Sequence, residues 1–101
     1  MYTTIELDKS RNFRYGMVAI SKIEKKFKKT ISNIDFNNLS MEETATIVWA
    51  GLEHEDDKLT PLKVMDLVDK HSNIKTVVET MGKAFQEAMG DNEAEEEDEK
   101  N

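Results

Sequence analysis

The sequence predicts a mainly α-helical domain, an irregular bundle of about four helices that is followed by an acidic tail. Four stretches carry apolar residues at helical spacing, and helix-starting residues precede most of them. From residue 91 onward the apolar spacing stops and seven acids occur in eleven residues. We therefore expect a helical domain over residues 1–90 and a disordered acidic tail over residues 91–101.

The N-terminal residues favour a short β-hairpin before the first helix. Residues 2–7 have β propensity, Asp8 and Ser10 are typical of a turn, and residues 11–14 can return as a second strand. The alternative is that Ser10 caps a helix that starts at once.

The first helix is predicted over residues 15–28. Its apolar positions, within an arc of roughly 120°, are Phe13, Gly16, Met17, Ile20, Ile23 and Phe27. The opposite side carries a basic stripe, Lys22, Lys25, Lys26 and Lys29. This stripe is first of all the solvated face of an amphipathic helix, and its alternative role is to follow nucleic-acid phosphates. A connection follows over residues 30–39, which Ile31, Ile34, Phe36 and Leu39 are expected to hold on the core.

Three further helices are predicted from their start signals. Ser40 and Glu43 form a capping box before a helix over 41–53. Thr60-Pro61 begins a helix over 61–70, whose apolar residues spread over a broad arc that predicts thorough burial. Ser72 or Asn73 caps a helix over 74–89, and Gly90 ends it.

Two of these helices carry well-defined apolar faces. The helix over 41–53 aligns Met41, Ala45, Val48, Trp49 and Leu52. The last helix confines its apolar residues to about 140°, and these are Ile74, Val77, Val78, Met81, Ala84, Phe85, Ala88 and Met89.

Charge is unevenly distributed along the chain. The net charge is −7, of which −6 lies in residues 91–101, whereas residues 9–29 carry +7 and residues 30–90 carry −6. No stretch approaches the roughly 20 apolar residues that span a bilayer, so we expect no membrane association. The chain has no cysteine, which excludes disulfides, thiolate metal sites and thiol catalysis.

No pattern of residues indicates catalysis, so we expect a protein that is not an enzyme and that holds no cofactor and no metal. The sequence contains no Gly-rich phosphate loop, zinc motif or nucleophile motif. The densest set of metal-ligating residue types is His54-Glu55-Asp56-Asp57, which lacks the glycine and the spacing of a calcium loop. It is therefore interpreted as a solvated loop.

Six methionines in 101 residues point to an adaptable apolar surface for a protein partner. The residues predicted to form it are Trp49, Met81, Phe85 and Met89. Simple filling of the core is the alternative explanation. Self-association through the last helix is a further expectation.

Several segments together resemble the tail assembly chaperones of long-tailed phages and prophages, over residues 2–90. They are residues 12–20, 23–25, 34–43, 47–52 and 59–61, with sequences NFRYGMVAI, IEK, IDFNNLSMEE, IVWAGL and LTP. The resemblance implies a helical protein that binds the tape measure protein and keeps it soluble until tail tube subunits polymerise around it. It also implies a location in the cytoplasm of the bacterial host and absence from the mature virion. The matching motifs are structural, so no functional residue follows from them.

Members of this family are often made in two lengths by ribosomal frameshifting. The chain ends in Glu99-Lys100-Asn101, which the codons GAA-AAA-AAC would encode, and these contain the slippery run A-AAA-AAC. If the coding DNA uses these codons, we expect a longer product as well, whereas GAG at position 99 or AAG at position 100 would remove the run. The alternative function, from another class, is a small regulatory protein that binds DNA through the lysine stripe or mimics DNA through its acids.

Overall fold

The computed structural model describes residues 3–90, and the predicted acidic tail over 91–101 lies outside the described residues. The elements follow in the order β1 (Thr3–Glu6), β2 (Ser10–Phe13), α1 (Met17–Phe27), the 3₁₀ turn η1 (Ile31–Asn33), α2 (Met41–Leu52), α3 (Pro61–His71) and α4 (Ile74–Ala88). The predicted mainly α-helical fold, with four helices and an N-terminal hairpin, is confirmed.

The two strands form an antiparallel hairpin in which Thr3 faces Phe13 and Glu6 faces Ser10. Ile5 and Phe13 turn their side chains into the core, which follows the two-residue period of a strand. In the turn, Arg11 donates from Nε and Nη2 to the two carboxylate oxygens of Asp8, both at 2.9 Å. The alternative of a helix capped by Ser10 is therefore wrong.

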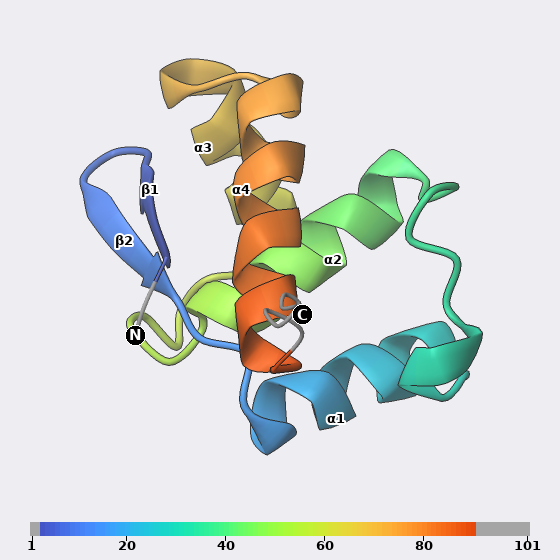
Figure 1. Ribbon diagram of the computed structural model, residues 1–101. Helices are drawn as coiled ribbons and strands as arrows, with labels where there is room; N and C mark the ends of the chain where they lie inside the picture. Colours follow the sequence, from blue (N-terminus) through green and yellow to red (C-terminus); the bar gives the residue numbers. More distant parts are fainter. Residues whose placement is uncertain (1–2, 91–101) are drawn as a thin grey trace, which may run out of the picture.

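Helix α2 lies at the centre of the molecule and packs against α1, α3, α4 and β2. In Figure 1 it crosses behind α4, with α1 below it and α3 above. Its buried residues, seven of the twelve in the helix, are Thr44, Ala45, Ile47, Val48, Ala50, Gly51 and Leu52. The core is thus built around one helix that is covered on most sides.

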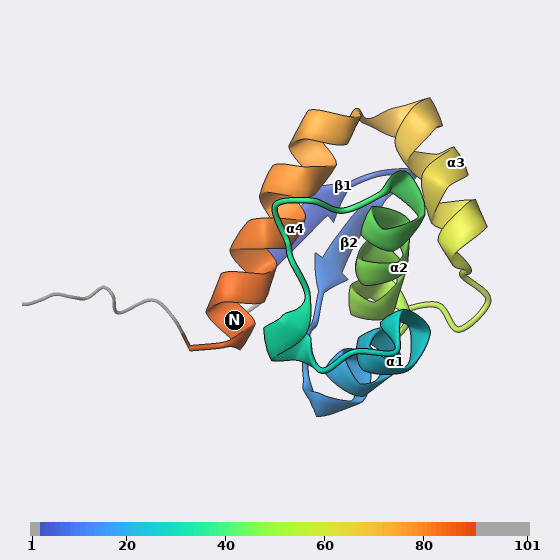
Figure 2. The ribbon, with the colours of Figure 1, turned by 90° about the vertical axis from the view of Figure 1, so that its right-hand side faces the viewer.

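Aromatic rings join the hairpin, α4 and the connection before α2. The Tyr15 ring lies 5.7 Å from that of Phe13 and 4.9 Å from that of Phe85, centroid to centroid. Phe36 contacts Phe85 from the other side, also at 4.9 Å. Figure 2 shows the connection that carries Phe36 running alongside α4. The rings therefore hold α4 between the chain before α1 and the chain before α2.

The predicted starts of the last three helices are confirmed. The Ser40 hydroxyl accepts from the Glu43 amide and the Glu43 carboxylate accepts from the Ser40 amide, at 3.1 and 2.8 Å. Thr60 accepts from the amide of residue 63. Asn73, rather than Ser72, caps α4 by accepting from the amide of residue 76. At the other end of α4, Gly90 has a φ of 73°, which a glycine adopts without steric cost.

Two sequence-based expectations about burial are wrong. Helix α1 begins at Met17 rather than at residue 15, because Tyr15 is held in the core and donates to the carbonyl of Ile47 at 2.7 Å. Met17 consequently lies outside the core and is 90% exposed. In α3 only Val64 and Val68 are buried, since this helix packs at the edge of the bundle, against α2 and α4.

Candidate protein-binding surface

The four residues predicted to form an apolar strip lie in different surroundings. Met81 is buried, Phe85 is half-buried between aromatic rings, and Met89 is exposed, all of them along α4. Trp49 lies on α2, and its indole Nε1 donates to the carbonyl of Leu59 at 2.9 Å. The structure thus brings three of the four residues together and places Trp49 apart from them.

The basic stripe is partly used inside the molecule. The ammonium groups of Lys22 and Lys26 lie over the Trp49 ring, 5.8 and 5.7 Å from its centroid, within the range of a cation–π interaction. Lys22 also forms an ion pair with Glu53, whereas Lys25 and Lys29, the other two members, are exposed. Because lysines occupy its ring face, Trp49 is a poor platform for stacking a nucleic-acid base.

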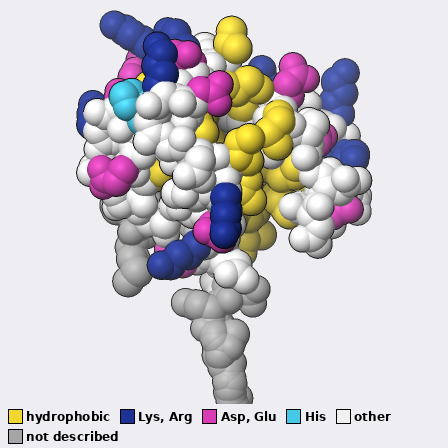
Figure 3. Space-filling model, turned by 90° about the horizontal axis from the view of Figure 1, so that it is seen from above, with side chains coloured by type: hydrophobic (Ala, Val, Ile, Leu, Met, Phe, Trp, Pro, Cys, Tyr) yellow, Lys and Arg dark blue, Asp and Glu magenta, His cyan; other side chains and the backbone are white. Residues whose placement is uncertain are grey.

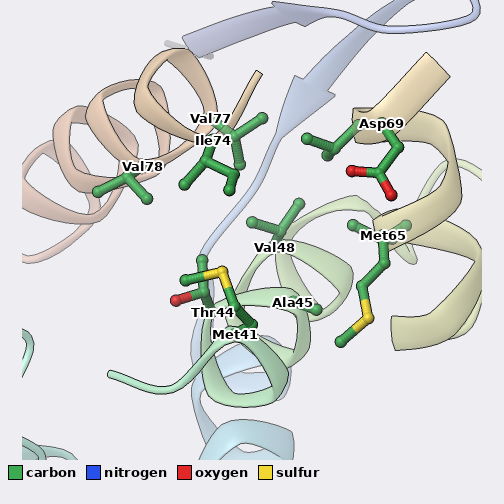
Figure 4. A pocket seen from close by; sticks show the side chains of 11 residues that line it. Met41, Thr44, Ala45, Val48, Met65, Asp69, Ile74, Val77 and Val78 are labelled. Atoms are coloured by element: carbon green, nitrogen blue, oxygen red, sulfur yellow. The ribbon is translucent and has the colours of Figure 1, made fainter. Parts of the chain in front are cut away.

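A groove with a volume of about 230 Å³ opens between α2, α3 and α4. It is lined by Met41, Thr44, Ala45, Val48, Val64, Met65, Val68, Asp69, Ile74, Val77 and Val78. Figure 4 shows these side chains converging on one space from three helices, with the Asp69 carboxylate on the α3 side. Within residues 3–90, Asp69 is the only charged residue that lines this central groove.

Two further hollows adjoin the central groove. Met65 also lines a hollow beside the start of α3 that includes Leu62 and Glu42. Val78 also lines a hollow along the second half of α4 that includes Phe36 and Met89. The three hollows therefore adjoin one another at these two side chains, and together they form a surface that carries most of the exposed large apolar side chains within residues 3–90.

We call this surface the apolar track. Its exposed members are Leu62, Met41, Ile74, Val78, Phe36 and Met89, which are between 40% and 74% exposed. Among residues 3–90, the exposed large apolar side chains outside the track are Met17 and Val18. Figure 3 shows hydrophobic side chains gathered into a band on this side of the molecule, with charged side chains on both flanks.

Methionines are concentrated on the track. Of the five methionines within residues 3–90, four line its hollows, namely Met41, Met65, Met89 and the buried Met81. The unbranched thioether side chain adapts its shape to different apolar neighbours. This surface can therefore accommodate apolar partners of differing shape.

The apolar face of α4 is wide because it serves both the core and the surface. At 100° per residue, its apolar arc divides into a buried part, with Val77, Met81 and Ala84, and an exposed part, with Ile74, Val78 and Met89. Helix α4 thus uses one half of its apolar arc for the core and presents the other half on the track.

Acids outnumber bases along the track. The acidic residues that line its hollows are Glu42, Glu43, Asp69 and Glu79, and the basic ones are Lys26 and Lys83. Glu43 is bound to the Ser40 amide in the capping box, and Lys26 lies over Trp49. The remaining charges are three acids and one lysine, which favour a cationic partner.

The titratable groups with a displaced pKa lie away from the track. A hydrogen bond from Arg11 lowers the pKa of the Asp8 carboxyl, and the same bond raises the pKa of Arg11. Burial raises the pKa of the Tyr15 phenol well above its ordinary value. Each of these groups has a structural partner, and in the described part of the chain no three His, Asp or Glu side chains gather as metal ligands.

Sequence reasoning missed most of the track. It assigned Met41, Ile74 and Val78 to packed helix faces and Phe36 to the core. Leu62 carried a usable signal, because it lies two positions before Val64 and therefore on the other side of the helix. For Met41, Ile74 and Val78, only the packing of neighbouring helices decides which part of an apolar helix face stays uncovered. Phe36 lies in a connection, where no helical period indicates its exposure.

None of the helices within residues 3–90 combines the length and the apolar character that crossing a bilayer requires. Comparisons of the chain with protein-family models, with curated proteins and with solved structures find no match.

Proposed function

We propose that this protein is a tail assembly chaperone that holds a tape measure protein through the apolar track. In this role it works in the cytoplasm of the bacterial host, helps to recruit tail tube protein, and is left behind when the virion is complete. The observation that carries the proposal is the exposure of six large apolar side chains along one surface. Contiguous apolar surfaces of this kind mark sites of protein interaction.

The physical basis is burial of apolar surface that both partners otherwise expose to water. A long helical partner with bare apolar segments would aggregate, and covering those segments removes the attraction between its copies. Because the methionines of the track are adaptable, one chaperone surface can cover segments of different sequence. The net charge of −7 then keeps the covered complexes dispersed.

Co-expression with the tape measure protein tests this function. We expect the tape measure to be soluble with the chaperone and to aggregate without it. The double substitution of Ile74→Ser and Val78→Ser removes two exposed track side chains and should lower the soluble fraction severalfold. Met17→Ser with Val18→Ser removes two apolar side chains that lie outside the track and are even more exposed, and it serves as the control.

The proposal is wrong if the soluble amount of tape measure protein is the same with and without the chaperone. Circular dichroism of both double variants checks that the fold is intact, so that a lower yield reports on capture rather than on unfolding.

A further inference from the structure

We propose that the apolar track is a docking groove for a single amphipathic helix with basic flanks, about four turns long. The inference rests on the proposed function in taking this helix to be a segment of the tape measure protein. The length, shape and charge of the track each favour such a helix.

The length of the site follows from α4. Ile74, Val78, Phe85 and Met89 lie at spacings of four, seven and four residues along α4 and its C-terminal end. The last lies fifteen positions after the first, which at a rise of 1.5 Å per residue is about 22 Å. A helix of about four turns covers this distance, and apolar residues at positions i, i+4, i+7, i+11 and i+15 would form one stripe along its full length.

The shape of the site allows a helix to come close. Gly82 lies on the exposed side of α4 and lines the same hollow as Phe36 and Met89. A Cβ atom added to Gly82 would meet no atom within 4 Å. The space above this residue is therefore open, and the backbone of α4 can be approached directly.

The charge of the track decides which kind of partner it favours. With Glu42, Asp69 and Glu79 along the track, a helix with lysine or arginine beside its apolar stripe is favoured. The acidic residues 91–101 of the same chain would be repelled. A symmetric dimer through the track would bring two copies of the same acids together, so a second copy is disfavoured as well.

A set of three labelled peptides tests the inference on the full chain by fluorescence anisotropy. The first is an amphipathic helix of four turns with leucines on one face and lysines beside them. The second has glutamates in place of these lysines, and the third has the composition of the first in scrambled order. We expect the lysine peptide to bind at least tenfold more tightly than either of the others at low salt, and the difference to shrink as salt screens the charges.

Two charge-reversal variants of the protein, one on the track and one outside it, form a matched comparison. Asp69→Lys should lower the affinity for the lysine peptide at least tenfold and raise the affinity for the glutamate peptide. Asp57→Lys makes the same change in net charge at an exposed acid of the α2–α3 loop, outside the track, and should change both affinities less than twofold. Gly82→Gln adds a side chain above the track and should reduce binding while the melting temperature stays the same or rises.

The outcomes separate this inference from the proposed function. If the peptides bind as expected but the tape measure protein is not held in solution, the groove is right and the function is wrong. If the tape measure is held but Asp69→Lys and Gly82→Gln leave all affinities unchanged, the function stands and the docking groove is wrong. If the chain is a dimer that Val78→Ser dissociates, and no peptide binds, the occupant is a second copy and the inference is overturned.

Discussion

At the scale of single residues, Gly51 marks the closest approach between α2 and the chain that precedes α1. A Cβ atom at this position would lie 2.6 Å from Cζ of Tyr15 and 2.8 Å from Cδ1 of Phe13. The Gly51 carbonyl also accepts from the Arg14 amide at 2.8 Å. The glycine therefore allows two rings and a backbone segment to lie directly on the central helix.

Gly51→Ala should lower the free energy of unfolding by about 2 kcal/mol, the usual cost of overpacking a core. Gly82→Ala is the matched control, because it adds the same methyl group to a helix in open space and should raise stability by up to about 1 kcal/mol. Urea denaturation of the two variants measures both changes. Equal effects of the two substitutions would contradict the close approach at Gly51.

The Asp8–Arg11 pair should make stability depend on pH. Asp8→Asn leaves the buried Arg11 charge without its partner, which should cost about 2 kcal/mol at pH 7. The pKa of Asp8 is lowered in the folded state, so its contribution is complete above the ordinary value of 3.8 and is lost as the pH falls through the folded pKa. Urea denaturation from pH 7 to pH 2 should therefore show the free energies of unfolding of the wild-type protein and the Asp8→Asn variant becoming equal at low pH. A difference that is the same at every pH would argue against the ion pair.

At the scale of the element, α4 divides its methionines between core and surface. Met81→Ala should cost about 3 kcal/mol, because it leaves a cavity beneath the helix. Met89→Ala should change stability by less than about 0.5 kcal/mol, because its side chain is half exposed at the end of the helix. Thermal denaturation measures both, and a large loss in the second variant would show that Met89 is part of the core.

The starts of three helices could be predicted from the sequence because the residues that cap them act locally. Ser40 needs only the backbone and side chain of Glu43, and Thr60 and Asn73 each need only an amide three residues ahead. The hairpin was harder to predict, because each of its strands has only four residues and is stabilised by the burial of Ile5 and Phe13 in the core.

The exposed half of each apolar face could not be predicted, because it depends on distant packing. Met81 and Val78 belong to the same predicted arc, yet one is buried and the other lines the groove. Trp49 is predicted to contact a partner, and its indole donates a hydrogen bond to the Leu59 carbonyl and lies beneath two lysines of α1, contacts that its sequence position does not indicate. Periodicity shows which side of a helix is apolar, and only the fold shows how much of that side is covered.

At the scale of the whole molecule, the hairpin and α4 depend on each other. Removing residues 1–13 takes Ile5 and Phe13 out of the core, at a cost of at least about 4 kcal/mol, which is most of the stability of a small domain. We expect hydrogen exchange in α4 to become fast in this truncated protein. Slow hydrogen exchange in α4 of the protein without residues 1–13 would contradict this dependence.

Removing residues 91–101, in contrast, should leave the melting temperature nearly unchanged.

The packing of β1 against α4, with a hydrogen bond from Thr3 to Glu87, has a consequence for the growing polypeptide. A nascent chain emerges from the ribosome with the hairpin first, and its stabilising helix is made last among the described elements. Because α4 is also one wall of the central groove, a chain that still lacks α4 has neither a finished fold nor a complete groove.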